Sequence, residues 1–248
     1  MTLREALSTP DGKGQYARRL FATIADRYDF ITVALSYGQD RRWKRRVIAL
    51  AGPRDGLRVL DLATGTGDLA FAAAARGARV VGLDITHRMI ELARRKAPAS
   101  PKLVGVEAER RRALQFLVGD MLALPFPAAS FDIVTTGYGL RNVADLAQAI
   151  EEIRRVLAPG GQALSLDFNR PANRVARAAY LAYLTMVGAT LGWVLHRDPD
   201  TYRYIPASIR HYPGAAAVAQ MFAARGFSRV RHYRVLGGLM VIHHATRD

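Results

Sequence analysis

Short apolar runs alternate with helical stretches through the middle of the chain. Residues 58–63 form an apolar run that ends in a Gly-rich turn, and an alanine-rich stretch typical of a helix follows over 68–76. The same order recurs at 79–84 and 88–96. Strands that alternate with helices at this spacing predict right-handed crossovers and a mostly parallel sheet. Further strands are expected at 114–120, 131–136 and 162–168, with a helix from about 145 to 157 that Pro159-Gly160-Gly161 ends.

The two ends of the chain depart from this alternation. Residues 14–51 carry apolar positions at helical spacing and predict a helical cap, and residues 171–212 predict a helical lid insertion. A short helix is expected near 214–225, followed by β-rich runs at 228–235 and 238–244 that suit an antiparallel hairpin. We therefore predict one α/β domain over residues 1–248. Its fold is Rossmann-like, with a seven-stranded, mostly parallel sheet and an antiparallel C-terminal hairpin.

A nucleotide-type turn follows the first predicted strand. Residues 65–70 read Gly-Thr-Gly-Asp-Leu-Ala and satisfy G-x-G-x-x-G/A at the point where a helix begins. Glycines at Gly65 and Gly67 allow a tight turn and let a ligand lie against the backbone. Asp84 ends the second strand 17 residues after Gly67, where a carboxylate can accept hydrogen bonds from both ribose hydroxyls. The alternative for Asp84 is an N-cap of the next helix.

Further acidic residues distinguish between two nucleotide cofactors. Asp61 lies within the turn motif, where a carboxylate would repel the pyrophosphate of NAD but attract the ammonium of S-adenosylmethionine (SAM). Asp120 ends the third strand and can accept a hydrogen bond from an adenine amino group, or it can be a turn residue before Leu122. Three acids that converge on one cleft favour SAM as the cofactor.

Composition and charge restrict the remaining possibilities. The chain has 248 residues and no cysteine, which excludes a disulfide scaffold, a thiolate zinc site and a cysteine nucleophile. Residues 1–13 are polar, so no signal peptide is visible and we expect a cytoplasmic protein. The net charge of +15 favours an anionic partner surface. Basic clusters lie at 41–46, 94–96 and 110–112, but without regularly interleaved aromatic residues, and no nucleic-acid partner is expected.

Several blocks carry a family resemblance over nearly the whole chain. Residues 59–68 resemble motif I of class I SAM-dependent methyltransferases. The blocks that resemble the ubiquinone/menaquinone biosynthesis C-methyltransferase family are Ala123-Leu124-Pro125-Phe126-Pro127, Gly139-Leu140-Arg141-Asn142-Val143 and 202–210, Tyr-Arg-Tyr-Ile-Pro-Ala-Ser-Ile-Arg. This resemblance implies methylation, by SAM, of a ring carbon of a polyprenylated quinol, which is a lipid-soluble substrate.

The resemblance also implies a set of site residues. It places SAM contacts at Thr66, Asp84, Asp120 and Met121, and Gly137 stands where the family commonly has a serine. The role of the long basic stretch between Lys96 and Leu114 is unassigned. With the turn residues, the expected cofactor-binding set is Asp61, Gly65, Thr66, Gly67, Asp84, Ile85, Asp120, Met121 and Gly137.

Methyl transfer to a ring carbon requires positioning, exclusion of water and stabilisation of a phenolate. Arg141 can stabilise the phenolate charge and Asn142 can orient a ring hydroxyl. Tyr28, with Asp29, can close over the cleft and relay a proton, and His243 is a conceivable base. The alternatives are a surface ion pair for Arg141, core packing for Tyr28 and a strand-surface position for His243. No metal site is predicted.

An uncharged apolar stretch indicates where the protein binds its lipid-soluble substrate. Residues 178–195 contain no charged side chain over 18 residues, the minimal length of a membrane span. A single crossing would separate strands of one sheet, so a lid that shelters a prenyl tail or dips into the membrane interface is expected instead. The alternative is a helix packed on the protein's own core. Basic clusters would favour peripheral contact with an anionic inner leaflet.

Other functions remain open at this point. A SAM-dependent methyltransferase for another phenol or a heteroatom is the main alternative. A nucleic-acid methyltransferase is less favoured, because residues 136–139 read Thr-Gly-Tyr-Gly and not [N/D]-P-P-[Y/F]. A non-catalytic SAM-binding protein and a nicotinamide oxidoreductase are two further possibilities. The sequence is compatible with an oligomer and with either a benzoquinol or a naphthoquinol substrate.

Overall fold

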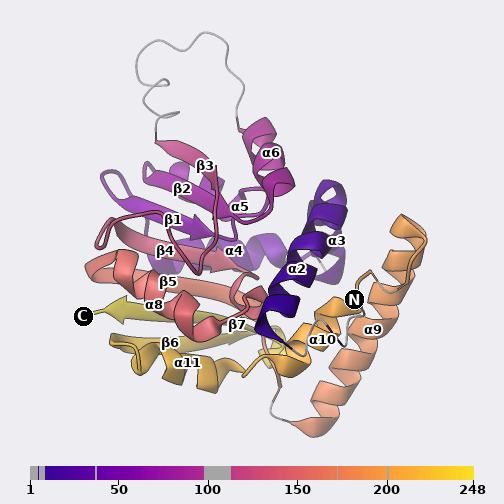
Figure 1. Ribbon diagram of the computed structural model, residues 1–248. Coiled ribbons are helices and arrows are strands. Elements are labelled where there is room, and N and C mark those ends of the chain that lie inside the picture. The colour runs from indigo at the N-terminus through magenta and orange to yellow at the C-terminus, as the bar shows by residue number, and fades with distance from the viewer. Residues whose placement is uncertain (1–4, 6–8, 37, 98–112, 172, 200) are drawn as a thin grey trace.

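A seven-stranded sheet forms the centre of the computed structural model, which describes residues 5, 9–36, 38–97, 113–171, 173–199 and 201–248. The strand order is β3-β2-β1-β4-β5-β7-β6 (Figure 1). Neighbouring strands from β3 to β5 pair in parallel, and β7 pairs antiparallel with both β5 and β6. The strands are β1 (Arg58–Leu62), β2 (Arg79–Asp84), β3 (Leu114–Val118), β4 (Phe131–Gly137), β5 (Leu157–Phe168), β6 (Phe227–Val235) and β7 (Met240–Arg247).

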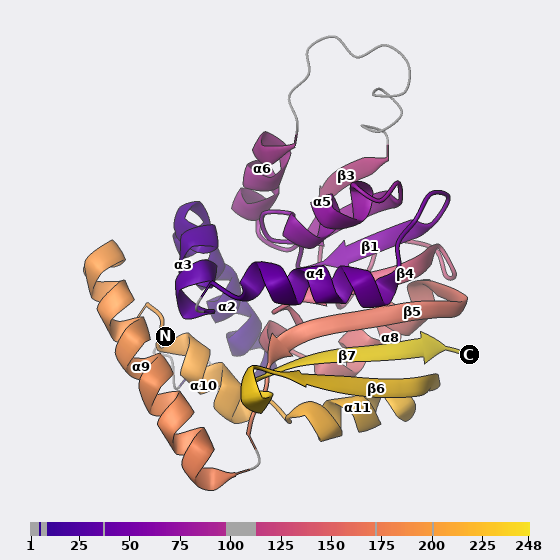
Figure 2. The same cartoon turned by 180° about the vertical axis from the view of Figure 1, so that it is seen from behind.

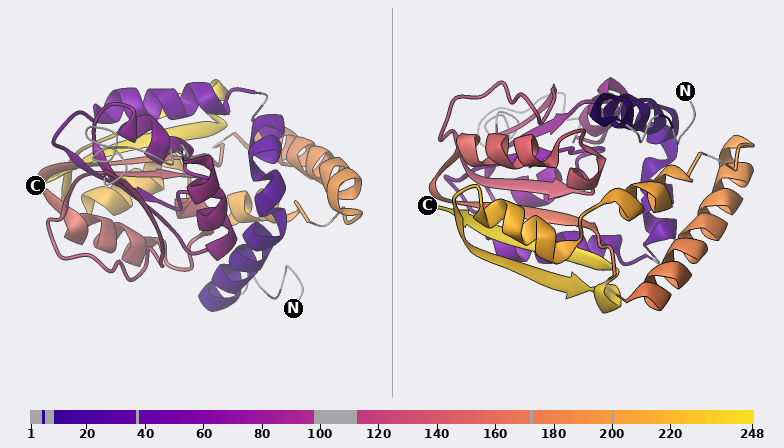
Figure 3. Two further views of the ribbon diagram at one scale, coloured as in Figure 1. Left: turned by 90° about the horizontal axis from the view of Figure 1, so that it is seen from above. Right: turned by 60° about the horizontal axis from the view of Figure 1, so that its bottom comes forward.

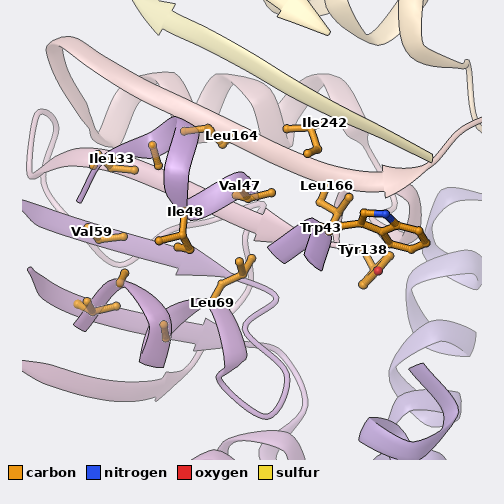
Figure 4. Close-up of a cluster of buried hydrophobic side chains, with 14 of the residues drawn as sticks. Trp43, Val47, Ile48, Val59, Leu69, Ile133, Tyr138, Leu164, Leu166 and Ile242 are labelled. Carbon is orange, nitrogen blue, oxygen red and sulfur yellow. The ribbon is translucent and has the colours of Figure 1, made fainter. Parts of the chain in front are cut away.

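Helices cover both faces of this sheet. On one face, α4 (Asp40–Ala51), α5 (Asp68–Ala74) and α6 (His87–Lys96) bury apolar side chains against the strands (Figure 4). On the other face lie α8 (Leu146–Val156) and α11 (Ala215–Ala223). Because successive side chains of a strand point to opposite faces, Val59 and Leu60 belong to different clusters. Figure 2 shows α4 crossing one face of the sheet.

A second group of helices lies beyond the carboxyl ends of the parallel strands (Figures 1 and 3). This group consists of α2 (Pro10–Ile24), η1 (Ala25–Arg27), α3 (Tyr28–Leu35), α9 (Arg174–His196) and α10 (Tyr204–His211). Its own core includes Leu20, Ile31, Leu35, Tyr202 and Tyr204. The 3-10 turns η2 (Leu140–Asn142) and η3 (Leu236–Gly238) are also present. These helices enclose the sheet edge at which α/β proteins bind their ligands.

The predicted sheet and hairpin are confirmed, while several boundaries differ. The helical stretch expected over 14–51 consists of α2, η1, α3 and α4, and the insertion over 171–212 consists mainly of α9 and α10. Pro159-Gly160-Gly161 does not separate α8 from β5, because α8 ends at Val156 and β5 begins at Leu157. The glycines form an irregularity within β5, where the register against β4 shifts and Gly160 has a φ of +76°. Most of the basic stretch between Lys96 and Leu114, including 110–112, lies outside the described residues.

Candidate active site

A cavity of about 380 Å³ lies where the loops after four parallel strands meet α2. The loop after β1 contributes Gly65. Asp84 comes from the end of β2, Asp120 follows β3 and Gly137 ends β4. The helix α2 lies over the opening, and Gly14, Ala17 and Phe21 line it from that side. The predicted residues on the wall of this main cavity are Tyr28, Gly65, Asp84, Ile85, Asp120, Met121, Gly137 and Asn142.

The Gly-rich turn after β1 has the conformation that its sequence requires. Gly65 and Gly67 have φ values of +55° and +91°, a region that L side chains rarely adopt. A Cβ atom on Gly67 would approach the ring of Phe71 to 2.8 Å and that of Phe116 to 3.0 Å. Gly67 is the N-cap of α5, so the turn delivers the backbone directly to a helix N-terminus. The main cavity therefore has a wall of backbone against which a ligand can lie closely.

Asp84 fixes this turn and also faces the cavity. The amide of Gly65 donates to Asp84 Oδ2 at 2.9 Å, and the amide of Thr86 donates to Oδ1 at 2.8 Å. The carboxylate is buried, and burial raises its pKa although both amides act in the opposite direction. Each oxygen keeps a second lone pair for a ligand hydroxyl. Thr86, and not Asp84, is the N-cap residue of α6.

Asp61 lies in a smaller neighbouring cavity and not in the main one. The hydroxyls of Thr64 and Thr135 donate to its two oxygens at 2.6 Å and 2.7 Å. Burial raises the pKa of Asp61 to about 6, against the effect of these two hydrogen bonds and of the nearby Lys44 ammonium. The small cavity shares Tyr28 and three other wall residues with the main cavity. The acids expected to line one cleft thus occupy two adjoining ones.

The remaining cofactor candidates divide between these two cavities. Asp120 lines the main cavity, and its Oδ1 accepts a hydrogen bond from the amide of Leu122 at 2.9 Å, so the turn role is present and the side chain can still face a ligand. Thr66 lines the small cavity, and its hydroxyl donates to Asp29 Oδ1 at 2.6 Å. This bond ties the Gly-rich turn to α3. Tyr28 lines the main and the small cavity, and burial raises its pKa to about 12, so its phenol is neutral.

A third, largely apolar cavity adjoins the main one and holds Arg141. The guanidinium is buried rather than on the surface, and its Nε lies 3.1 Å from Asp167 Oδ1. It also donates to Ser208 and, at 3.2 Å, to Asn142 Oδ1, and its carbon lies 4.9 Å from the ring centre of Phe168. This apolar cavity is lined by Leu20, Phe21, Ile24, Tyr28, Ile31, Thr32, Leu35, Ser36, Tyr138, Arg141, Phe168, Tyr202, Tyr204 and Ile205.

Asn142 and His243 differ in their relation to these cavities. The amide nitrogen of Asn142 donates to the carbonyl of Tyr138 at 2.7 Å, which fixes the side chain at the wall of the main cavity. His243 lies on β7 beneath α11, away from the three cavities, with Nε2 2.9 Å from the carbonyl of Ala215. Burial lowers its pKa to about 4. The structure therefore places His243 neither at the cavity nor on the strand surface.

Two polar residues of this region were not among the predicted site residues. Asp167, near the end of β5, is fully buried and pairs with Arg141. Its signal in the sequence is an acid within an otherwise apolar run, since buried charges require partners. Tyr138 lines all three cavities, and its hydroxyl donates to the buried Asp40 at 2.7 Å. Tyr138 has a φ of +62°. No group of metal-ligating side chains occurs in the described part of the chain.

Comparison with known proteins gives the family. The model of the ubiE/COQ5 methyltransferase family matches residues 10–247. The chain belongs to this family. A demethylmenaquinone methyltransferase of Thermus thermophilus is 43% identical over 92% of the chain and all of that protein. One of Deinococcus radiodurans is 40% identical over 94% and 92% of the two chains. A ubiquinone/menaquinone biosynthesis C-methyltransferase of Geotalea uraniireducens is 34% identical over 93% and 96%.

Solved structures confirm the fold at lower sequence identity. A SAM-dependent methyltransferase of Thermotoga maritima, described as a possible histamine N-methyltransferase, gives a TM-score of 0.65 at 15% identity over 94% of this chain and 100% of that one. A phosphoethanolamine N-methyltransferase of Haemonchus contortus, in complex with SAM, gives 0.59 at 16% identity over 84% and 52%. The chain therefore has the class I methyltransferase fold, and its family implies the use of SAM.

The buried ion pair of Arg141 generates a stability prediction. Asp167→Asn leaves a buried guanidinium without its counter-charge, and we expect the free energy of unfolding to fall by about 3–5 kcal/mol. Urea unfolding followed by circular dichroism measures this loss. The matched control is Asp132→Asn, which breaks the more exposed pair with Arg58 and costs about 0–1 kcal/mol. A loss at Asp167 no greater than the loss at Asp132 would contradict a structural role for the buried pair.

Proposed function

We propose that this chain transfers a methyl group from SAM to a ring carbon of a lipid-soluble quinol in menaquinone or ubiquinone biosynthesis. The observation that carries this proposal is the junction of two unlike cavities. The main cavity has backbone and carboxylates suited to a nucleoside, whereas the adjoining cavity is apolar and ends at a buried guanidinium. A hydrophobic ring and tail next to a cofactor of mixed polarity require this combination.

The wall residues fit SAM. We assign Asp84 to the ribose hydroxyls, Asp120 to the adenine amino group and Asp61 to the ammonium of the methionine part, with Gly65 and Gly67 permitting close approach. Carboxylates suit a ligand that carries positive charge and would repel a pyrophosphate. When bound, SAM supplies a methyl group that its sulfonium already activates. Thr66, Ile85, Met121 and Gly137 complete the proposed cofactor-binding set.

The chain's own residues bind and orient the second substrate. The apolar cavity excludes water from the ring, and the guanidinium of Arg141 stabilises negative charge on a ring oxygen. Asn142 and the neutral phenol of Tyr28 orient the ring at the junction of the cavities. In the overall reaction a methyl–sulfur bond breaks, a methyl–carbon bond forms and the ring carbon loses one proton. We assign that proton to solvent on the side of the main cavity, because His243 lies away from the cavities and Tyr28 holds its own proton at neutral pH.

A naphthoquinol is the substrate class that we propose first. The Thermus and Deinococcus relatives, at 43% and 40% identity, are named demethylmenaquinone methyltransferases. Relatives at 34–36% identity carry names that include both ubiquinone and menaquinone biosynthesis. None of these names favours a phenol of secondary metabolism.

Incubation with labelled SAM and each demethylated quinol under reducing conditions tests the function. We expect a demethylated naphthoquinol to gain one methyl group, detected by mass spectrometry. The paired variant Arg141→Gln/Asp167→Asn removes both buried charges together and leaves neither unpaired. We expect it to lower turnover by about 100-fold or more and to leave the affinity for SAM unchanged. Absence of methylation of either quinol would refute the function, and a parallel loss of SAM affinity would refute the role of Arg141.

The pKa of Asp61 generates a pH prediction for SAM binding. In the protein without SAM, the carboxyl of Asp61 has a pKa of about 6. Below pH 6 this carboxyl is mostly protonated and does not attract an ammonium group. We expect SAM affinity to rise as the pH increases from 5 to 7 and then to level off, with proton release on binding near pH 6. Calorimetry in buffers of different ionisation enthalpy measures both the affinity for SAM and the number of protons released on binding. Asp61→Asn should abolish the component centred near pH 6, and an unchanged profile would remove Asp61 from the ammonium site.

We also propose peripheral contact with an anionic membrane through α9. One stripe of this helix is buried and includes Tyr180, Leu184 and Gly188, while its other stripe exposes Met186 and Trp193. Among the described residues, α9 is the one helix long and apolar enough to cross a membrane, yet only 28% of its apolar window is buried. Figure 3 shows it along the outer side of the molecule. The exposed side chains of the proposed surface are Phe30, Val33, Val175, Met186, Trp193 and Val194.

Charges at the ends of α9 favour an orientation in the plane of the membrane. Arg174 is exposed at its first turn, and Arg197 follows its last residue. Between them the exposed stripe carries no charge, so the apolar side chains can enter the interface while the arginines meet anionic headgroups. α3 packs against α9, and its exposed Phe30 extends the same surface. This surface adjoins the helices that line the apolar cavity, which gives a lipid tail a short route to it.

The fluorescence of Trp193 tests this contact. The chain has two tryptophans, and Trp43 is buried, so Trp43→Phe leaves Trp193 as the single reporter. We expect a blue shift of its emission on addition of phosphatidylglycerol vesicles, weakened by salt and smaller with phosphatidylcholine. Met186→Ser/Val194→Ser should weaken the shift, whereas Val118→Ser, an exposed valine on β3, should leave it unchanged. A shift that is independent of anionic lipid would contradict the charge component.

A further inference from the structure

The apolar cavity contains a buried phenol that has no partner. Tyr204 begins α10, is fully buried and lines this cavity. Its ring stacks on that of Tyr16, with centres 5.5 Å apart, but its hydroxyl makes no hydrogen bond. An unpaired buried hydroxyl destabilises a protein, and most such groups in native proteins have a partner. A phenol of this kind on a cavity wall therefore indicates a ligand atom that accepts its hydrogen bond.

Arg141 stands on the same wall with unused hydrogen-bonding capacity. Its Nε and Nη1 are occupied by Asp167, Asn142 and Ser208. Its Nη2 has no acceptor among the residues that the structure describes. Tyr204 and Ser208 are four residues apart and thus share one face of α10. The hydroxyl of Ser208 accepts a hydrogen bond from the guanidinium. The helix α10 consequently presents the phenol and holds the guanidinium from a single face.

The two groups are electrostatically complementary to an anionic oxygen. Burial raises the pKa of Tyr204 to about 12, and the positive charge of Arg141 lowers it. The phenol is therefore a neutral donor at physiological pH and the guanidinium is a charged one. The other wall residues of this cavity are mainly aromatic and aliphatic, and its volume of about 50 Å³ suits the oxygen-bearing edge of a ring whose remainder lies in the main cavity.

We propose that Tyr204 binds the substrate by donating a hydrogen bond to a ring oxygen, to which Arg141 Nη2 donates the second. This inference rests on the proposed function and adds a specificity-determining residue to it. Two donors on one oxygen stabilise its deprotonated form more than its protonated form. The bound quinol hydroxyl then ionises at a lower pH, and the ring carbon beside it becomes more electron-rich. Tyr204 thereby selects substrates that carry a hydroxyl next to the methylated carbon.

Tyr212 provides a matched control within the same chain. It is also buried, and its hydroxyl also has no partner. The charges of Asp167 and Arg141 act on the pKa of Tyr212, as they do on the pKa of Tyr204. However, it packs in the apolar cluster of α8 and α11 and lines none of the cavities described here. Tyr212→Phe therefore removes a buried, unpaired hydroxyl near the same ion pair without removing a proposed substrate contact.

The first experiment compares Tyr204→Phe with Tyr212→Phe in quinol methylation. We expect Tyr204→Phe to lower kcat/KM for the quinol about tenfold, the effect of one hydrogen bond to a charged group, with unchanged affinity for SAM. The acidic limb of its kcat profile should move to higher pH, because the bound hydroxyl ionises less readily. Tyr212→Phe should retain the wild-type kcat/KM and the wild-type position of the acidic limb. Equal profiles for the two variants would overturn the role of Tyr204.

A second measurement does not depend on turnover. Titration of 1-naphthol, bound to the SAM-loaded protein, reports the ionisation of a ring hydroxyl through its absorption spectrum. We expect the wild-type protein and Tyr212→Phe to lower the pKa of the bound naphthol and Tyr204→Phe to lower it less. A wild-type protein that lowers this pKa but methylates no quinol would refute the proposed function and leave the Tyr204 site standing. Methylation with no difference between the variants would refute the Tyr204 site alone.

Discussion

The ion pair between Arg141 and Asp167 is the interaction on which the site depends. It joins three parts of the chain that are distant in sequence, because η2 carries Arg141, β5 carries Asp167 and α10 contributes Ser208. The amide of Arg141 also donates to Asp167 at 2.9 Å, so the carboxylate holds both the backbone and the side chain of the loop after β4. Two charges this deeply buried are stable only together. The position of the guanidinium is thus set by the fold and not by a flexible loop.

A related principle governs the acids on the proposed cofactor side. Asp61 and Asp84 are buried carboxyls whose hydrogen bonds come from neutral donors, two hydroxyls for Asp61 and two amides for Asp84. Neutral donors orient a carboxylate without cancelling its charge, which remains available to a cationic or hydroxyl-bearing ligand. Arg141, in contrast, has a full counter-ion, and within the described part of the chain only its Nη2 lacks an acceptor. The site therefore combines acids held by neutral hydrogen-bond donors on one side with a cation held by its counter-ion on the other.

Much of this arrangement follows from local sequence. The sheet was predictable because apolar runs, turns and helices alternate regularly, and Asp84 and Asp120 were predictable because ligand groups collect at the ends of parallel strands. The separation of Asp61 into its own small cavity was not, since the direction of a buried side chain depends on Thr135 of a strand far along the chain. His243 lies in a β-rich run like those of many exposed residues, but α11 packs over it and buries it. Long-range packing determined both.

The glycines of α9 have a consequence for the neighbouring helices. A Cβ atom on Gly192 would lie 2.4 Å from the carbonyl of Asp198, and one on Gly188 would lie 3.2 Å from Tyr202. The backbone of α9 is therefore in close contact with the segment that leads into α10. A side chain at either position would push the two segments apart, so this close packing requires glycine. Through these two glycines, α9 on the outer side of the molecule (Figure 3) packs closely toward α10, the helix whose Ser208 accepts a hydrogen bond from the guanidinium.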